Sequence, residues 1–383
     1  MYRPLLSLLT ITLASLAMPK PMAPSNVPAA RVLANAVANV RAHPDDPDAR
    51  YAAGRIRFMI FCANDPATIQ MYKDVSPFRF AGFYPGPWEM NGAKPRRDAK
   101  TVKLVMDAIS DLRAAIRLDK GREPGLYHLT LACMVEVAAP IASAVDPKAS
   151  PGGWRKLAER EYGLAFDAAK PADANQASYG RWISVEAGQE VLRLDPDSPK
   201  KKEIQAHLAK MASLPPGPIS PIVFSLRESL PLSDLLDVTQ KVEFDLDGTG
   251  GPQKWPWVKP ETAILVWQPD PSVPITSGRQ LFGSATWWMM FKDGYAAMAA
   301  LDNDRNGWLE GKELFGLAVW RDANGNGRSE AGEVVPVRSL GIEGIATRAS
   351  GRSGRSLVNK LGLRLRDGRV LPTYDWVATP LSP

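Results

Sequence analysis

One spacing of oxygen-bearing side chains occurs twice within residues 301–335, LDNDRNGWLEGKELFGLAVWRDANGNGRSEAGEVV. The first copy starts at Asp302 and the second at Asp322, and each has a glycine at its sixth position, Gly307 or Gly327. Glycine permits a bend that other residues resist. Two tight acidic turns must therefore fit side by side, and the surrounding fold has to accommodate both.

Both copies carry side-chain oxygens at positions one, three, five, nine and twelve. Calcium takes about six to eight oxygen ligands, and this spacing, with a backbone carbonyl at position seven, is the calcium loop of the EF-hand. The alternative is a pair of polar turns that bind no metal. We call residues 302–313 loop one and residues 322–333 loop two. Trp308 and Arg328 are expected to contribute backbone carbonyls. The pattern predicts these calcium ligands: Asp302, Asp304, Asn306, Trp308, Glu310 and Glu313 in loop one, and Asp322, Asn324, Asn326, Arg328, Glu330 and Glu333 in loop two.

The two loops differ in charge. Asp302, Asp304, Glu310 and Glu313 give loop one four carboxylates, whereas loop two has three, Asp322, Glu330 and Glu333. More negative charge favours tighter calcium binding, so loop one is expected to fill first.

The separation of the loops bears on what calcium does. Only the segment LFGLAVWR separates Glu313 from Asp322, so we expect one short helix to leave loop one and enter loop two. Pro336 follows loop two and opposes an exiting helix. Because a calcium sensor works by swinging helices apart, these features favour a structural ion over a switch.

Residues 1–22 predict an export signal. Arg3 precedes an uncharged apolar run, and small residues follow it where a cleavage site would stand. The alternative is a membrane anchor, but the run is shorter than the roughly 20 residues that span a bilayer. We expect an exported protein, periplasmic or extracellular, with no integral membrane segment after cleavage.

Residues 23–213 predict helices. Within residues 101–119, Val105, Ile109 and Leu112 recur at helical spacing and form one apolar stripe. Three helix-turn-helix segments resemble tetratricopeptide-type repeats, which implies a protein partner for the helical part; an irregular bundle is the alternative. An irregular insertion at residues 63–99 is either a ligand-binding loop or an aromatic plug, with these aromatic residues: Phe78, Phe80, Phe83, Tyr84 and Trp88.

Residues 214–222 contain a proline-rich stretch that predicts a linker, and residues 223–383 change to short strands between glycine and proline turns. Short helices are expected near DGYAAMAALD and KELFGLAVW. Eight of the eleven tryptophans lie in this part, where filling the core is expected rather than binding sugar: Trp255, Trp257, Trp267, Trp287, Trp288, Trp308, Trp320 and Trp376.

The order VEFDLDGTG, ILVW, SGRQLFG, DGYAAMAALDNDRNG, VWRDANGNG and GIEGI resembles the EF-hand-like calcium-binding domain of bacterial secreted proteins. The resemblance covers most of residues 240–346 and implies calcium binding and export, but no reaction. The expected class is α+β: helical hairpins followed by a small mixed α/β domain.

Two further loop-like segments depart from this pattern. The segment with Gln268, Asp270 and Ser272 has Val273 and Arg279 where glycine and glutamate belong, so no metal is expected there. Asp245 and Asp247 resemble the start of another loop, but Pro256 stands at position twelve, and calcium would need a distant ligand such as Glu261.

No phosphate-binding loop, nucleophile elbow or zinc-protease helix occurs in the sequence, and we expect a non-enzymatic protein that does not bind nucleic acid. The alternative is an envelope polysaccharide hydrolase that uses Asp or Glu, with calcium as a structural ion. The basic segment of residues 347–369 predicts a mobile loop and then a strand with a solvated face, or else a surface that docks on a polyanion. Cys62 and Cys133 are either bridged or buried separately.

Overall fold

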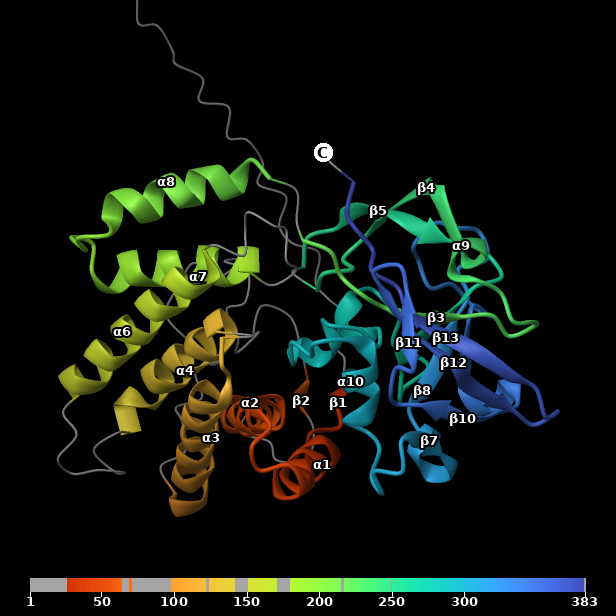
Figure 1. The fold of residues 1–383 in the computed structure, drawn as a ribbon, viewed down its shortest axis with the longest axis horizontal. Helices are drawn as coiled ribbons and strands as arrows, with labels where there is room; N and C mark the ends of the chain where they lie inside the picture. Colours follow the sequence, from red (N-terminus) through yellow and green to blue (C-terminus); the bar gives the residue numbers. More distant parts are fainter. Residues whose placement is uncertain are drawn as a thin grey trace, which may run out of the picture.

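The computed structural model describes residues 26–63, 69–70, 98–121, 124–141, 151–170, 180–214, 217–248 and 250–381. The predicted export signal and the five aromatic residues of the insertion lie outside these ranges. Within them, helices make up the first part of the chain and an antiparallel sheet the second (Figure 1). The predicted α+β class is therefore confirmed.

We call the described residues 26–214 the helical half and the described residues 217–381 the sheet half. The helical half consists of consecutive helices that pack on their neighbours. A two-stranded ribbon, β1 (Asn26–Val27) with β2 (Ile69–Gln70), and the short 3-10 helix η1 (Ala139–Ile141) accompany them. The helices of this half are α1 (Ala29–Ala42), α2 (Pro47–Ala63), α3 (Ala99–Leu118), α4 (Pro124–Ala138), α6 (Pro151–Ala169), α7 (Gly180–Leu194) and α8 (Lys201–Ala212).

Helix α3 shows why these segments are helical. The carboxylate of Asp98 accepts the backbone N–H of Thr101 (2.9 Å), which caps the first turn. The predicted stripe of Val105, Ile109 and Leu112 is buried, so the apolar face of α3 packs into the core as its spacing predicted.

Among its described residues, the sheet half contains a sheet of nine antiparallel strands in the order β7-β10-β12-β13-β3-β6-β8-β9, with β11 beside β12, and a separate β4–β5 ribbon. Its strands are β3 (Ile222–Phe224), β4 (Leu236–Phe244), β5 (Gln253–Val258), β6 (Ala263–Trp267), β7 (Trp308–Glu310), β8 (Leu317–Trp320), β9 (Val334–Pro336), β10 (Ile342–Ala346), β11 (Gly351–Ser353), β12 (Ser356–Leu365) and β13 (Val370–Asp375). Its helices are α9 (Leu232–Leu235) and α10 (Gly294–Ala299), with 3-10 turns η3 (Gly278–Gln280), η4 (Thr286–Trp288), η5 (Gly311–Leu314) and η6 (Val337–Leu340).

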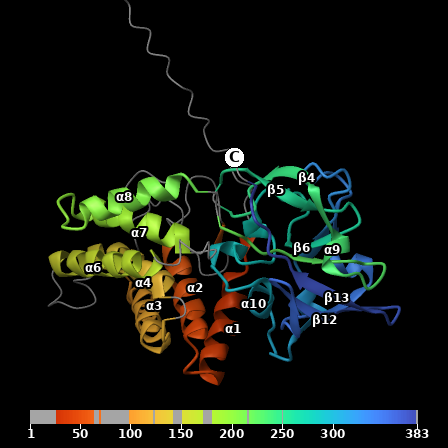
Figure 2. The ribbon, with the colours of Figure 1, turned by 45° about the horizontal axis from the view of Figure 1, so that its top comes forward.

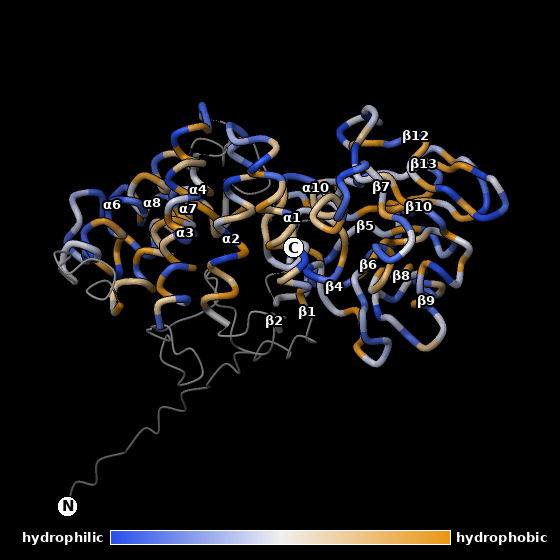
Figure 3. Tube along the Cα trace, turned by 90° about the horizontal axis from the view of Figure 1, so that it is seen from below, coloured by the Kyte–Doolittle hydropathy of each residue, from blue (hydrophilic) through white to orange (hydrophobic). Residues whose placement is uncertain are grey.

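The two halves share one apolar core. Phe58 and Leu129 of the helical half belong to the same buried cluster as Trp287 and Met289 of the sheet half. Figures 1 and 2 both place α1 and α10 between the other helices and the sheet, and Figure 3 shows apolar segments running through both halves. Because this core crosses the junction, the halves are expected to support each other's stability.

Polar contacts also cross the junction. Buried Arg55 of α2 donates through Nη2 to the backbone oxygen of Trp288 (2.7 Å). The hydroxyl of Tyr51 donates to the backbone oxygen of Met289 (3.1 Å). The predicted linker is shorter than its proline content suggested, since Ile219 already bridges to Ala378 and Ile222 begins β3.

The expected helix between the two loops is wrong. Gly311–Leu314 forms a 3-10 turn and Leu317–Trp320 forms β8, which pairs with β6 and β9. All four residues of β8 are buried, because the strand is covered on both faces. The expected mobile loop after residue 347 is wrong as well, since β11 and β12 form a hairpin there.

Most tryptophans of the sheet half fill its core, as predicted. Trp255, Trp257, Trp287, Trp288 and Trp320 are each fully buried. Cys133 is also buried, and the Tyr162 hydroxyl donates to its Sγ (3.5 Å). The side chain of Cys62 lies outside the described residues, so a disulfide remains a prediction.

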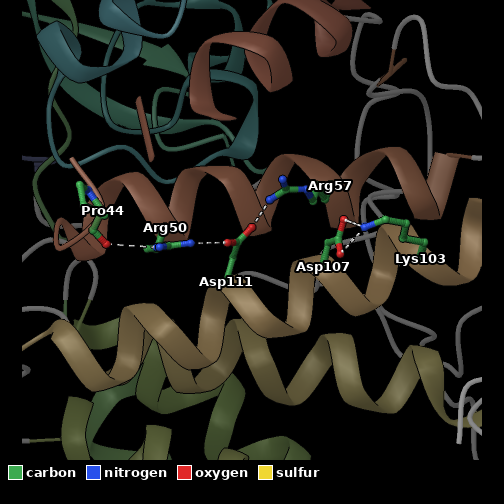
Figure 4. Close-up of polar contacts among 6 residues, drawn as sticks. All are labelled: Pro44, Arg50, Arg57, Lys103, Asp107 and Asp111. Carbon is green, nitrogen blue, oxygen red and sulfur yellow. Dashed lines mark hydrogen bonds and ion pairs between the residues drawn. The ribbon is translucent and has the colours of Figure 1, made fainter. Parts of the chain in front are cut away.

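Two carboxylates of α3 have different ion-pair partners (Figure 4). Asp111, with 10% of its side chain exposed, forms ion pairs with Arg50 (3.4 Å) and Arg57 of α2, whereas exposed Asp107 pairs with Lys103 one turn away on its own helix (2.8 Å). Burial raises the pKa of Asp111, and Arg57 and Arg50 only partly oppose this. The Asp111 carboxylate is therefore costly to bury, and removing it would leave two half-buried cations unpaired.

We expect Asp111→Ala to destabilise the protein by about 2 kcal/mol, since breaking a buried pair strands its partner charges. Asp107→Ala is the matched control and should change the free energy of unfolding by less than about 0.5 kcal/mol, as exposed pairs contribute little. Urea unfolding of both variants measures the difference. If Asp111→Ala and Asp107→Ala lowered the free energy of unfolding equally, the ion pairs of Asp111 with Arg50 and Arg57 would have no special structural role.

Candidate metal centre

The first residue of each loop binds the backbone of the sixth. The N–H of Gly307 donates to Oδ2 of Asp302 (2.9 Å), and the N–H of Gly327 donates to Oδ2 of Asp322 (2.7 Å). Both glycines have a positive φ, +89° and +70°. The left-handed backbone turns each N–H inward, which explains why glycine stands at position six.

The last residue of each loop folds back over it. Glu313 accepts the N–H of Asn303 on Oε1 (2.5 Å) and that of Glu310 on Oε2 (3.2 Å). Glu333 makes the same two bonds, to Ala323 (2.9 Å) and to Glu330 (3.0 Å). Each closing glutamate thus joins the beginning and the end of its loop.

The middle residues also correspond. Asp304 and Asn324, at position three, each accept the N–H two residues later, at 3.0 and 3.1 Å. Asn306 and Asn326, at position five, do the same at 2.7 and 2.8 Å. The two loops therefore share a set of hydrogen bonds that recur position by position, although near the end of each loop the positive φ falls on Gly311 in loop one and on Gly332 in loop two.

Loop one brings three carboxylates together. Ligand oxygens of Asp302, Asp304 and Glu313 all lie within 4.8 Å of one another. Oδ1 of Asp302 is buried and has no hydrogen-bond partner among the described residues. Burial raises the pKa of Glu313, and the charges of Asp302 and Asp304 raise it further. A divalent cation would relieve this repulsion and occupy the unpartnered oxygen.

Loop two satisfies more of its own oxygens. Asp322 also accepts the indole N–H of Trp257 (2.6 Å), and Glu330 accepts the side-chain amides of Asn324 (2.9 Å) and Asn326 (3.0 Å). Burial is the largest cause that raises the pKa of Asp322. Loop one is therefore the stronger candidate metal site of the two.

One predicted ligand of loop one lies outside the cluster. Glu310 forms an ion pair with Arg364 of β12, and the Arg364 guanidinium stacks on the ring of Trp308 at 3.7 Å. The structure thus shows a competing partner for Glu310, which sequence spacing did not reveal.

The other loop-like segments have different surroundings. Asp245 accepts the N–H of Gly250 (2.8 Å) and the hydroxyl of Ser277 (2.6 Å), and burial together with the charge of Asp247 raises its pKa. Glu261, the suggested distant ligand, is exposed and pairs with Arg227 (3.0 Å). Asp270 accepts from Ser272 within its own turn.

Helix α1 binds directly to loop one. Oδ1 of Asn303 accepts Nε of Arg31 (2.9 Å) and Nδ2 of Asn35 (3.0 Å), and Arg31 also donates to the backbone oxygens of Leu301 and Glu313. In the opposite direction, Nη1 of Arg305 donates to the backbone oxygen of Ala38 (2.9 Å). Burial lowers the pKa of Arg31, opposed by Glu313 and Asp302. Nothing in the sequence signals this contact, since its partners lie about 270 residues apart.

A cavity of about 530 Å³ lies beside this contact, lined by α1, α2, α4, the segment around α10 and Asp302. Among its lining carboxylates, Asp48 accepts the Tyr127 hydroxyl (2.7 Å) and pairs with Lys292 (3.5 Å), and Asp293 caps α10 through the N–H of Ala296 (2.7 Å). Burial raises the pKa of Asp293. Both groups are engaged in contacts within the fold, and the lining also includes Asp46 and Asp302.

Comparisons with known proteins concern the sheet half. The family model of the SPM domain matches residues 233–371, which include both loops. Iron-regulated protein FrpA of Neisseria meningitidis serogroup C is 32% identical over 94 residues, which are 23% of this chain and 8% of FrpA. The chain therefore spans a small part of that relative's length. Among the described residues, no helix has the length and apolar character needed to cross a membrane.

Proposed function

We propose that this protein binds calcium through loops one and two, and that the ions hold the sheet half in shape and attach it to α1. The observation that carries the proposal is the convergence of Asp302, Asp304 and Glu313, with a buried Asp302 oxygen that lacks a partner. The sheet half would then be an EF-hand-like domain of an exported, non-enzymatic interaction protein, and the helical half, if repeat-like, would supply the surface for a protein partner.

The proposed ligands are those of the loop pattern. Carboxylate oxygens from positions one, three and twelve would neutralise the ion, and the carbonyls of Trp308 and Arg328 would add backbone oxygens. In loop two, neutral amide oxygens of Asn324 and Asn326 would stand at positions three and five, whereas loop one has the carboxylate of Asp304 at position three. Loop one, with more charge, is expected to bind more tightly, although Arg31 and Arg364 lie close to it.

The surrounding elements favour a structural ion. Strand β8 connects the loops and lies between β6 and β9, and loop two is followed by β9 and the 3-10 turn η6. A sensor EF-hand opens by moving its two helices apart. Strands held on both sides cannot move in that way without breaking the sheet, so calcium is expected to fix the loops rather than switch them.

Calorimetric calcium titration of the full chain tests this proposal. We expect two binding events in the native protein, one in Glu313→Gln, one in Glu333→Gln and none in the double variant, because each closing glutamate supplies two oxygens. The event that remains in Glu313→Gln should be the weaker. Two events retained in the double variant would show that calcium binds elsewhere.

A further inference from the structure

A cationic hairpin is formed by β11 and the beginning of β12 in the sheet half. Strand β11 pairs with the start of β12 in the register Ser353 opposite Ser356, so Gly354 and Arg355 form a two-residue turn. Gly354 has a φ of +59°, as the first central position of a tight hairpin turn requires. The hairpin is therefore a defined structural element and not a loose loop.

The cations of this hairpin lack acidic partners among the described residues. Residues 348–360 contain no Asp or Glu and carry four positive charges, in a chain whose net charge is +6. The four side chains are exposed, and the described contacts among them are limited to the bond from Arg352 to the backbone oxygen of Arg355 (3.3 Å): Arg348, Arg352, Arg355 and Lys360.

The next cations along the chain behave differently. Arg364 pairs with Glu310, Arg366 with Glu343 (3.4 Å) and Arg369 with Asp367 (2.7 Å). Charge compensation thus operates from Arg364 onwards, at the end of β12 and in the following turn, but no acidic partner of the hairpin cations is present among the described residues. An exposed set of uncompensated cations creates a local positive field that attracts anions.

The composition of the hairpin limits the kind of anion. The large apolar side chains of residues 348–360 are Leu357, which is half-buried and lines the cavity, and Val358, which is buried; exposed Leu361 follows the hairpin directly. Residues 348–360 contain no aromatic ring on which a nucleobase could stack. Guanidinium groups bind carboxylate and sulfate-like oxygens with paired hydrogen bonds. A hydrated chain of repeating anionic groups fits these features.

We propose that the hairpin of residues 348–360 is a docking surface for an acidic polysaccharide. The contact is electrostatic and independent of calcium, since none of its four cations belongs to the proposed ligands. Binding should therefore weaken steeply with salt, and it should persist when both calcium loops are disabled.

The test compares two triple variants of the full chain. Arg352→Gln, Arg355→Gln and Lys360→Gln remove three hairpin charges. The matched control removes the same charge from the helical half, where each cation has an acidic partner: Lys103→Gln (Asp107), Lys170→Gln (Glu203) and Lys200→Gln (Asp167). Binding to dextran sulfate, to uncharged dextran and to vesicles that contain phosphatidylglycerol is measured over a range of salt concentrations, with thermal unfolding to verify the fold.

We expect the native protein and the control variant to bind dextran sulfate equally, and the hairpin variant to bind at least about tenfold more weakly with a shallower salt dependence. Uncharged dextran should not bind. Equal loss in both variants would overturn the proposal in favour of a general charge effect. Binding to vesicles without binding to dextran sulfate would overturn it in favour of a lipid surface, and no binding to either anion would overturn it altogether.

Discussion

Glu313→Gln is expected to remove most of the stabilisation that calcium gives this protein and to release α1 from the sheet half. Glu313 holds the backbone N–H of Asn303, and the side chain of Asn303 accepts from both Arg31 and Asn35 of α1. A calcium ion that orders loop one would therefore order the contact surface of α1. At a calcium concentration of about 100 times Kd, a bound ion contributes about 2.7 kcal/mol.

Two measurements check this result. Thermal unfolding should show a Tm several degrees lower for Glu313→Gln in calcium, by about 2 to 4 °C per kcal/mol, and little difference in EGTA. Hydrogen exchange should become faster in α1 when calcium is removed from the native protein, and should be fast in the variant in either condition. An equal fall in Tm in EGTA would contradict structural calcium.

Glu333→Gln is the matched control for the α1 contact. Loop two touches the β4–β5 ribbon instead, since Gln240 donates to the Gly325 oxygen (2.7 Å) and Trp257 donates to Asp322 (2.6 Å). Glu333→Gln should therefore increase exchange in β4 and β5 while α1 stays protected. If both variants expose α1 equally, the attachment of α1 does not depend on loop one in particular.

Asp375→Asn is expected to stabilise the protein by a few kcal/mol at pH 7 and to do little at pH 4. Burial raises the pKa of Asp375 to about 8, and the nearby charge of Asp293 adds to this. In the unfolded chain an Asp has a pKa of about 3.9. The folded state therefore keeps a proton that the unfolded state has lost, and each pH unit between these values costs about 1.4 kcal/mol.

The sign of this effect is set by the raised pKa. The contribution of Asp375 to the free energy of unfolding is fully present below about pH 4. It falls as the pH rises towards 8, and above that pH it falls no further. Asparagine cannot ionise, yet it keeps an oxygen that accepts the Gly294 N–H, as Asp375 does at 3.1 Å. The gain from the substitution should therefore grow with pH across this window.

Urea unfolding in EGTA at several pH values between 5 and 8 measures that gain, with calcium binding removed from the comparison. Asp270→Asn provides a control at an exposed carboxylate that accepts only within its own turn. Its stability curve should run parallel to that of the native protein. A parallel curve for Asp375→Asn would show that the buried carboxyl is not protonated in this range.

Local patterns in the sequence predicted local structure well. The stripe in α3 follows from helical spacing, and the glycines and oxygen-bearing residues of both loops predicted turns that the hydrogen bonds confirm. The buried tryptophans follow from the large apolar area that each would otherwise expose. In each of these cases the interacting residues are near in the sequence, or burial alone decides the outcome.

Long-range partners decided the cases that sequence reasoning missed. Leu317–Trp320 is a short apolar run, which periodicity cannot assign to helix or strand, and pairing with β6 and β9 makes it a strand. Glu310 stands at a ligand position, yet Arg364 lies close enough to pair with it. The attachment of α1 to Asn303 depends on two segments whose proximity only the fold establishes.

The position of β3 in the sheet has a consequence for the order in which this protein can be made. Strand β3 begins the sheet half, but its neighbours are β6 and β13, and Ile219 just before it bridges to Ala378. Until β13 has left the ribosome, β3 lacks one of its two neighbours. Such distant pairing slows folding. The sheet is thus expected to stay incomplete while the segments between β3 and β13 are made, and to close only once β13 has been synthesised.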